Sequence, residues 1–168
     1  MRNRPLTLLA MAAVCVCAPG QPRKQKVEPP EEVYYANAFA DYYRVPRCLV
    51  HAIIIQESGW NCSLVSDKGA IGCMQLMPTT ARKYGVRHLF SVSENIGGGV
   101  RYLADLIKEF KDLRLVAAAY YAGSHRLEYR GLNYSNANVT EYVRSVRRIY
   151  DDEVNRHQLQ KDTAARGE

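Results

Sequence analysis

The sequence predicts a mainly α-helical chain with one folded domain, and three observations support this prediction. Between residue 31 and about residue 154, apolar residues recur three or four positions apart, which is the spacing of a helix with one buried face. Prolines stand where several of these segments begin, and glycines stand where they end. The 168 residues, 47% hydrophobic and 24% charged, are enough to bury one core and exclude a disordered chain.

The first three predicted helices cover residues 31–43, 46–58 and 78–84. Each of them begins at a proline or directly after one, and the second and third end before a glycine. The run of isoleucines at residues 53–55 has β-propensity, but the proline before it and the glycine after it favour a helix.

The later predicted helices cover residues 93–111, 113–122 and 140–154. Ser93 is the candidate N-cap of the first, whose apolar residues share one face. The second is almost wholly apolar and ends at Gly123. Residues 61–77 and 124–137 are rich in Gly, Ser and Asn, so we expect loops or short hairpins there.

The N-terminal residues are expected to be a secretory signal peptide. Two arginines precede an apolar run at residues 6–18 that is too short to span a bilayer comfortably. We expect a signal peptide at residues 1–20, a linker at 21–30, the folded domain at 31–150 and a polar tail at 151–168. The exported chain would be periplasmic, with no transmembrane span once the signal is removed. Lipid attachment at Cys15 or Cys17 is the alternative, and Val14 and Val16 before them argue against it.

Cys48, Cys62 and Cys73 would remain in the exported chain. An oxidising compartment would allow one disulfide among them, and the sequence leaves the pairing open. Their spacing does not match a zinc site, and His51 stands alone near them, so we treat it as an ordinary helix residue and predict no metal.

The net charge of +6 suits a polyanionic partner, such as nucleic acid, anionic lipid or a cell-wall polymer. Arg144, Arg147 and Arg148 cluster on the last predicted helix, where a solvated helix face explains them. Because an exported chain has little reason to meet nucleic acid, we predict no nucleic-acid partner.

Glu57 is the candidate catalytic residue. It ends an apolar helix, where apolar surroundings and the negative end of the helix dipole both raise the pKa of a carboxyl group. A carboxyl that keeps its proton near neutral pH can act as a general acid on a glycosidic oxygen. The position also suits a partly exposed helix-end glutamate beside Trp60, so it does not decide the function by itself.

The chain from Glu57 onward resembles the core motif of the lytic transglycosylases of the soluble-lytic type, whose SLT domain has a lysozyme-like fold. The matching residues are Glu57, Ser58, Ser66, Gly69, Ala70, Gly72, Met74, Gln75, Met77 and Pro78. Later blocks match at Asn95, Ile96, Gly99, Tyr102, Leu103, residues 119–123, Tyr142 and Val143. The resemblance covers about residues 33–150 and implies a lysozyme-like single helical domain with a short loop or hairpin region beside the active-site cleft.

The resemblance also implies an enzyme without a cofactor. It implies cleavage of the β-1,4 bond between N-acetylmuramic acid and N-acetylglucosamine in peptidoglycan, with closure of a 1,6-anhydro ring on the muramic acid. One glutamate acts first as acid and then as base, and Glu57 holds that position here. Small members of the family often serve secretion or conjugation machines, so such a machine is an expected partner besides the glycan strands. We expect a monomer.

The resemblance assigns further residues to the substrate. Ser66 and Gln75 match polar residues that hydrogen-bond near the acid and the sugar, and Met77 matches an apolar wall of the groove. Tyr120 and Tyr142 match aromatic residues of the cleft, and the Tyr142 hydroxyl is expected near the glutamate.

Two alternatives stay open. A hydrolytic muramidase of the same fold would use a second carboxylate, and Asp67 and Glu94 are the candidates, although a turn residue and a helix-dipole partner explain them. A catalytically weak peptidoglycan-binding assembly protein is the other. The one indication of such a binding protein is Tyr121, which is expected to face the substrate. The family usually has asparagine at this position, and a phenol is bulkier than that amide.

Overall fold

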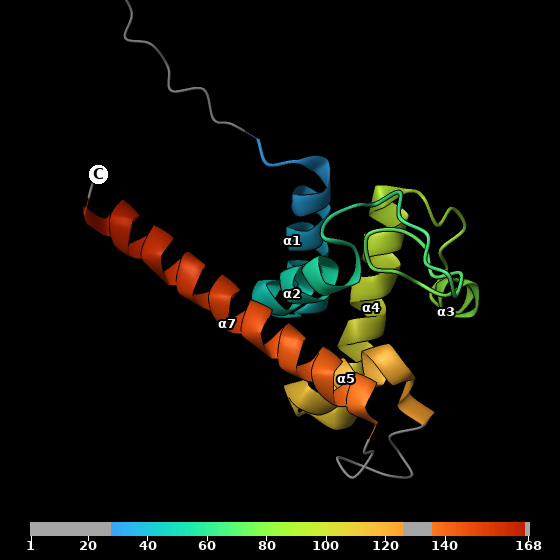
Figure 1. The fold of residues 1–168 in the computed structure, drawn as a ribbon. Helices are drawn as coiled ribbons and strands as arrows, with labels where there is room; N and C mark the ends of the chain where they lie inside the picture. The colour runs from blue at the N-terminus through green and yellow to red at the C-terminus, as the bar shows by residue number, and fades with distance from the viewer. Residues whose placement is uncertain (1–27, 126–135, 167–168) are drawn as a thin grey trace, which may run out of the picture.

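The computed structural model describes residues 28–125 and 136–166. In this part of the chain there are six α-helices and no β-sheet, which confirms the predicted mainly helical fold (Figure 1). The helices are α1 (Glu31–Tyr43), α2 (Arg47–Ser58), α3 (Pro78–Lys83), α4 (Val92–Phe110), α5 (Leu113–Ala122) and α7 (Ala137–Arg166). The predicted signal peptide lies outside the described residues. None of the described helices is both long and apolar enough to cross a membrane.

Five of these helices form a closed ring around the core. α1 packs on α2 and α4, α5 packs on α4 and α7, and α7 packs on α2, so every helix of the ring has two neighbours. Ile53, Ile96, Leu103 and Val116 are fully buried inside the ring and come from three different helices. The ring also packs α2 directly against α7, the two helices that position the site.

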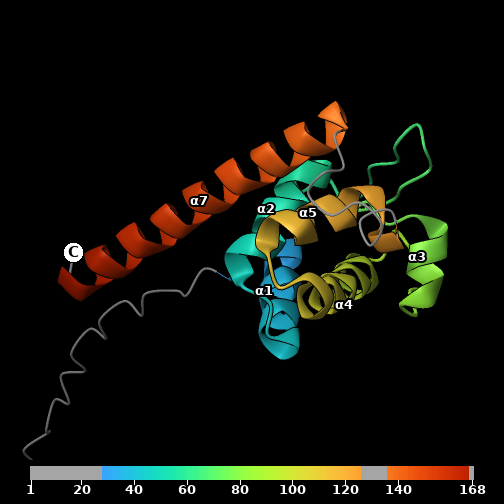
Figure 2. The ribbon, with the colours of Figure 1, turned by 90° about the horizontal axis from the view of Figure 1, so that it is seen from below.

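Helix α7 is longer than the sequence predicts. The apolar spacing predicts a helix at 140–154, whereas α7 continues to Arg166 through residues predicted to form a polar tail. The last turns are mostly exposed, and Gln158 Nε2 donates to Asp162 Oδ1 at 3.0 Å across one helical turn. Figure 2 shows that this half of α7 projects beyond the other helices. A helix without a buried stripe has no apolar period, which is why the pattern misses it.

The N-cap of α4 is Ser91, and the prediction of Ser93 is wrong by two positions. Ser91 has extended backbone angles and its Oγ accepts from the Glu94 N–H at 3.4 Å. The Glu94 carboxylate accepts from the N–H groups of Arg87 and His88 at 2.7 and 3.0 Å. Glu94 is thus engaged in holding the preceding turn, and these bonds lower its pKa.

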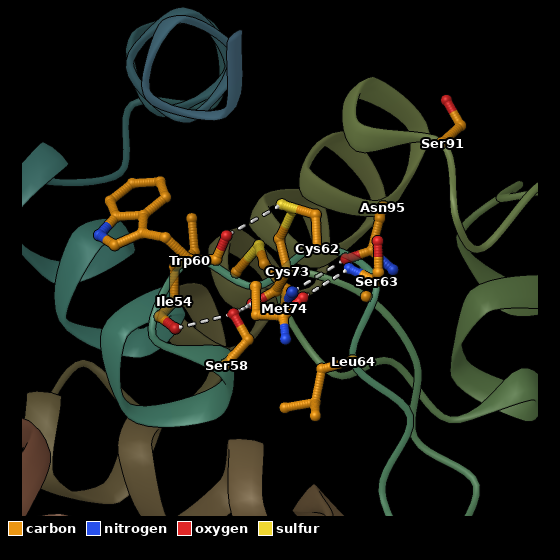
Figure 3. The surroundings of a disulfide bond; sticks show 12 residues. Ile54, Ser58, Trp60, Cys62, Ser63, Leu64, Cys73, Met74, Ser91 and Asn95 are labelled. Carbon is orange, nitrogen blue, oxygen red and sulfur yellow. Dashed lines mark hydrogen bonds between the residues drawn. A yellow bond between two sulfur atoms is a disulfide. The ribbon is translucent and has the colours of Figure 1, made fainter. Parts of the chain in front are cut away.

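The loop between α2 and α3 carries most of the matched motif and is held at several points (Figure 3). A disulfide joins Cys62 to Cys73, which answers the pairing that the sequence leaves open. Closing a loop of this length stabilises a fold by about 3 kcal/mol in chain-entropy terms. Buried Asn95 donates to the carbonyls of Ile71 and Leu89 at 2.8 and 2.9 Å and accepts from Met74 N–H at 2.9 Å.

A glycine on α4 lets this loop lie directly on the helix. A Cβ placed on Gly99 would come within 2.4 Å of the Met74 sulfur, so any larger residue would push the loop away. Within the loop, isolated antiparallel bridges join Ile71 to Val65 and to Leu76. The expected loop or hairpin region is therefore present as a compact turn rather than a regular hairpin.

Candidate active site

Glu57 lies in the last turn of α2 and is partly buried. Burial raises the pKa of its carboxyl to about 7, and a hydrogen bond from Tyr142 offsets part of this shift. The helix ends at Ser58, and the C-cap residue Gly59 has a left-handed backbone (φ 57°) that turns the chain toward the loop. The apolar end of α2 thus produces a carboxyl group whose pKa is raised well above its usual value.

Tyr142 holds the glutamate from α7. Its hydroxyl donates to Glu57 Oε1 at 2.5 Å, and its side chain is only 6% exposed. Burial and the nearby Glu57 raise the pKa of Tyr142 well above its usual range, so the phenol stays neutral and keeps its proton to donate. One carboxyl oxygen is therefore fixed by a neutral donor.

A second polar pair lies beside the first. Ser145, one turn after Tyr142 on α7, donates to the side-chain oxygen of Gln56 at 2.5 Å. The two consecutive residues at the end of α2 are thus both tied to α7. This registers the two helices at the point where Glu57 sits.

A groove of about 550 Å³ opens over Glu57. Its lining residues are Glu57, Ser66, Asp67, Lys68, Ala70, Gln75, Met77, Tyr120, Tyr121, Ala122, Asn136, Asn138 and Val139. The structure thereby brings together six of the seven residues expected at the site, and Tyr142 lies against Glu57 at its edge. A smaller cavity of about 300 Å³ between α5 and α7 contains none of them.

The polar side chains expected at the sugar are partly engaged by the loop itself. Gln75 has a left-handed backbone (φ 46°), and its Nε2 donates to the carbonyls of Leu64 and Gly72, both at 3.0 Å. Ser66 Oγ accepts from the Ala70 N–H at 3.0 Å, which leaves the hydroxyl proton able to reach a ligand. These two residues shape the loop as well as the groove wall.

Tyr120 connects the groove wall to the core. Its hydroxyl donates to the Met74 carbonyl at 2.8 Å, and its ring lies 5.2 Å from that of Tyr102. Met77 is 42% exposed and offers an apolar surface to the groove. Tyr120 therefore anchors the Met74–Gln75 turn, a role that the motif alone does not reveal.

Tyr121 stands on the groove surface, 43% exposed, and its ring stacks on Tyr142 with centroids 4.6 Å apart. The departure from the usual asparagine thus touches the residue that holds Glu57. Lys68, Asn136 and Asn138 also line the groove and were not expected there. Lys68 lies between the matched Ser66 and Gly69, which was the available signal. Asn136 lies in the segment predicted only as loop, and Asn138 lies between that segment and the last predicted helix.

Of the two other carboxylates weighed in the sequence, one reaches the groove. Asp67 lines it from the exposed turn of the loop, whereas Glu94 is bound to backbone N–H groups outside it. What the groove offers is one carboxyl with a raised pKa, a neutral donor on it and a wall of aromatic and amide groups.

Comparisons with known proteins agree with this arrangement. A transglycosylase of Enterobacteria phage PRD1 is 35% identical over 92 residues, which is 55% of this chain and 34% of the phage protein. A Haemophilus influenzae protein named as a soluble lytic murein transglycosylase is 35% identical over 103 residues, 55% of this chain and 17% of that protein. This chain thus spans about a third of the length of the phage protein and less of the Haemophilus protein.

Two solved structures share the fold. The 70 kDa soluble lytic transglycosylase of Escherichia coli superposes with a TM-score of 0.66 and 25% identity, over 74% of this chain and 24% of that one. An inactive mutant of the lytic transglycosylase Slt of Pseudomonas aeruginosa superposes with a TM-score of 0.62 and 27% identity, over 73% of this chain and 24% of that one. The profile of the transglycosylase SLT domain matches residues 34–142, a span that contains Glu57, the whole loop and Tyr142. The chain therefore belongs to the transglycosylase SLT domain family.

Proposed function

We propose that this chain is a peptidoglycan lytic transglycosylase that cleaves the β-1,4 bond between N-acetylmuramic acid and N-acetylglucosamine. The observation that carries the proposal is Glu57: a carboxyl with a pKa of about 7, in the wall of a groove, held on one oxygen by Tyr142. Family membership supports a transglycosylase activity, and the two relatives are named as a transglycosylase and a soluble lytic murein transglycosylase.

The geometry suits a single acid that later acts as a base. Because Tyr142 occupies Oε1, the other oxygen of Glu57 is the one that can carry a proton to the glycosidic oxygen. As the proton leaves, the Tyr142 hydroxyl stabilises the carboxylate that forms. The carboxylate can then take the proton of the C6 hydroxyl of the muramic acid as that oxygen attacks C1. The bond to the leaving sugar is replaced by the 1,6-anhydro bond, and no water is consumed.

A hydrolytic muramidase is the second candidate, because Asp67 lines the same groove. Ordinary glycosidases place two carboxyls across the scissile bond. Asp67, however, is exposed on its turn and beside the exposed Lys68. We therefore favour the mechanism that uses Glu57 alone, and the products distinguish the two.

The test is mass spectrometry of purified peptidoglycan digested by the chain. Muropeptides one water lighter than hydrolysis products are expected from the parent and from Asp67→Asn, and no cleavage is expected from Glu57→Gln. Products of full mass that disappear in Asp67→Asn would identify a muramidase instead. A folded parent that binds glycan without cleaving it would favour the weak peptidoglycan-binding protein.

The place of action follows from the substrate. Peptidoglycan lies outside the cytoplasmic membrane, so the activity requires export, which the apolar run at residues 6–18 supports. The Cys62–Cys73 disulfide suits an oxidising compartment such as the periplasm. Action as a monomer, in the service of a secretion or conjugation apparatus, is part of the proposal on family analogy. Cell fractionation with detection of the processed chain tests the export.

A further inference from the structure

Three potential metal ligands meet at the α2–α7 interface, on residues that do not line the groove. One ligand atom each from His51, Glu153 and His157 all lie within 4.8 Å of one another. His51 and Glu153 are 7% and 3% exposed, and His157 is partly buried. Glu153 and His157 are four residues apart on α7, which places them on the same helix face, and His51 faces them from α2.

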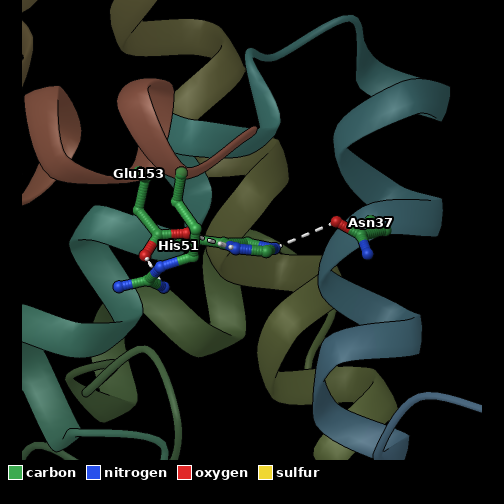
Figure 4. A network of polar contacts seen from close by, with 4 residues as sticks. Asn37, His51 and Glu153 are labelled. Carbon is green, nitrogen blue, oxygen red and sulfur yellow. Dashed lines mark hydrogen bonds and ion pairs between the residues drawn. The ribbon is translucent and has the colours of Figure 1, made fainter. Parts of the chain in front are cut away.

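The two ring nitrogens of His51 face different residues, Asn37 on one side and Glu153 on the other (Figure 4). Nε2 lies 2.9 Å from the side-chain oxygen of Asn37 on α1, an acceptor, so Nε2 carries the proton and donates it. Nδ1 lies 3.2 Å from Glu153 Oε2. With the proton on Nε2, Nδ1 presents its lone pair toward Glu153. Two buried acceptors then face each other, an arrangement that a cation between them would satisfy.

The remaining contacts suit such a cation. Glu153 pairs with Arg156 through its other oxygen, Oε1, so Oε2 is left for the histidine side. A metal-bound histidine commonly donates its second N–H to a carbonyl or carboxylate, which fixes the ring, and Asn37 supplies that acceptor here. Cys48 lies one turn before His51 on α2 but outside this group of ligand atoms.

We propose that His51, Glu153 and His157 form a binding site for one divalent transition-metal ion, with Zn²⁺ the best match. Two imidazoles and one carboxylate form a nitrogen and oxygen set that zinc takes with three protein ligands and a water. Zinc bonds of about 2.0–2.2 Å place tetrahedral ligand atoms roughly 3.4 Å apart. The 3.2 Å between His51 and Glu153 already fits, and His157 needs only a side-chain adjustment.

The ion would clamp the two helices that also carry the candidate catalytic pair. α2 carries His51 and Glu57, and α7 carries Tyr142, Glu153 and His157. An ion bound only by the folded chain stabilises it in proportion to the logarithm of the ion concentration. The site is therefore a structural staple of the α2–α7 interface, independent of whether the groove cleaves glycan.

The test measures zinc binding and stability rather than cleavage. The full chain, stripped with a chelator, is titrated with ZnCl₂ by calorimetry, and its thermal midpoint is followed in the same series. One ion per chain is expected, and at a hundredfold excess over Kd the midpoint should rise by about 5–10 °C. X-ray absorption at the zinc edge should show nitrogen and oxygen neighbours only.

Matched variants make the result specific. His157 is partly exposed, so His157→Ala should fold. It should lose both the bound ion and the zinc-dependent rise in midpoint, and Glu153→Gln should lose both as well. His88→Ala, an exposed histidine away from the cluster, should keep both. If His157 only packed against its neighbours and bound no metal, His157→Ala would have a lower midpoint but the same response to zinc as the parent. That outcome, sulfur neighbours at the zinc, or a parent chain that binds no ion at tens of micromolar would overturn the proposal.

Discussion

The α2–α7 interface holds a carboxyl at each of two places, and its partner differs between them. At the groove, Glu57 of α2 receives a hydrogen bond from Tyr142 of α7 at 2.5 Å. Farther along, Glu153 of α7 faces His51 of α2 at 3.2 Å and pairs with Arg156. Both carboxyls are removed from water, but only the second has groups beside it that can carry positive charge.

This difference explains why only one of the two suits proton transfer. A neutral phenol cannot compensate a full negative charge, so burial keeps the pKa of Glu57 at about 7 and its proton available. Arg156 pairs with Glu153 through Oε1 and His51 faces its Oε2, contacts that suit a structural role. The lesson is that the partner, more than the burial, decides what a buried carboxyl can do.

The largest expected effect comes from removing the proton at the groove. Glu57→Gln keeps the shape of the side chain and its contact with Tyr142 but cannot transfer a proton. General acid–base catalysis contributes about 10²–10⁴-fold, so we expect the cleavage rate to fall by about 10³-fold or more. The measurement is the initial rate on purified peptidoglycan, with glycan binding as the control that the groove is intact. Turnover within tenfold of the parent would contradict the role of Glu57.

The next largest effect is the dependence of stability on pH, which reports the raised pKa of Glu57. The folded-state pKa of Glu57 is raised to about 7 from 4.5, so the folded chain holds a proton that the unfolded chain releases between these values. The free energy of unfolding should therefore fall by about 2–3 kcal/mol as the pH rises from 4.5 through 7. Denaturant unfolding at a series of pH values measures it.

Glu57→Gln is the control for that series. The amide does not titrate, so the difference in unfolding free energy between parent and variant should vary with pH over the window from 4.5 to 7 and be constant above it. Parallel curves across the whole range would mean that the Glu57 carboxyl has an ordinary pKa in the folded chain.

Tyr142→Phe tests the neutral donor itself. The hydrogen bond lowers the pKa of Glu57, so its loss should raise that pKa further. The rate depends on protonated Glu57, so the limb on which activity falls with rising pH should move upward by the same amount. At its optimum the rate should fall by about tenfold, because a charge-assisted bond to the carboxylate is lost.

Ser145→Ala is the comparison for this variant. It removes the neighbouring bond between α2 and α7, to Gln56, and should cost about 1 kcal/mol of stability while leaving the pH limb in place. If both variants move the limb equally, the position of the helices rather than the Tyr142 hydroxyl sets the pKa of Glu57.

Much of the groove could be predicted from the sequence because its residues lie in short ordered motifs. Ser66, Gln75 and Met77 fall within one loop that follows Glu57 closely in the sequence, and the apolar end of α2 already indicates a raised pKa for Glu57. The starts of the first three helices followed from proline to within one residue. At α4 two serines compete for the cap, and Ser91 is the one with extended backbone. Pattern and local propensity are sufficient where the interactions are local.

The far end of the same interface could not be predicted. His51 stands alone in its sequence neighbourhood, and its partner Glu153 lies 102 residues later on a helix whose polar last turns carry no apolar period. Neither the C-terminal extension of α7 nor its meeting with α2 is visible in any local spacing. Only the packing of the ring of helices brings these residues together.

Tyr121→Asn restores the usual family residue and is expected to have the smallest effect. The Tyr121 ring stacks on Tyr142, and such a pair contributes about 1 kcal/mol beyond its buried area, so the variant should be destabilised by about that amount. With Tyr142 less firmly held, we expect the cleavage rate to fall severalfold while glycan still binds. Steady-state rates and thermal midpoints of the variant and of Tyr121→Phe, which keeps the ring, measure it. A higher rate in Tyr121→Asn would mean that the phenol obstructs the groove. The exposed Tyr121 ring would then hinder substrate binding rather than help to hold Tyr142 against Glu57.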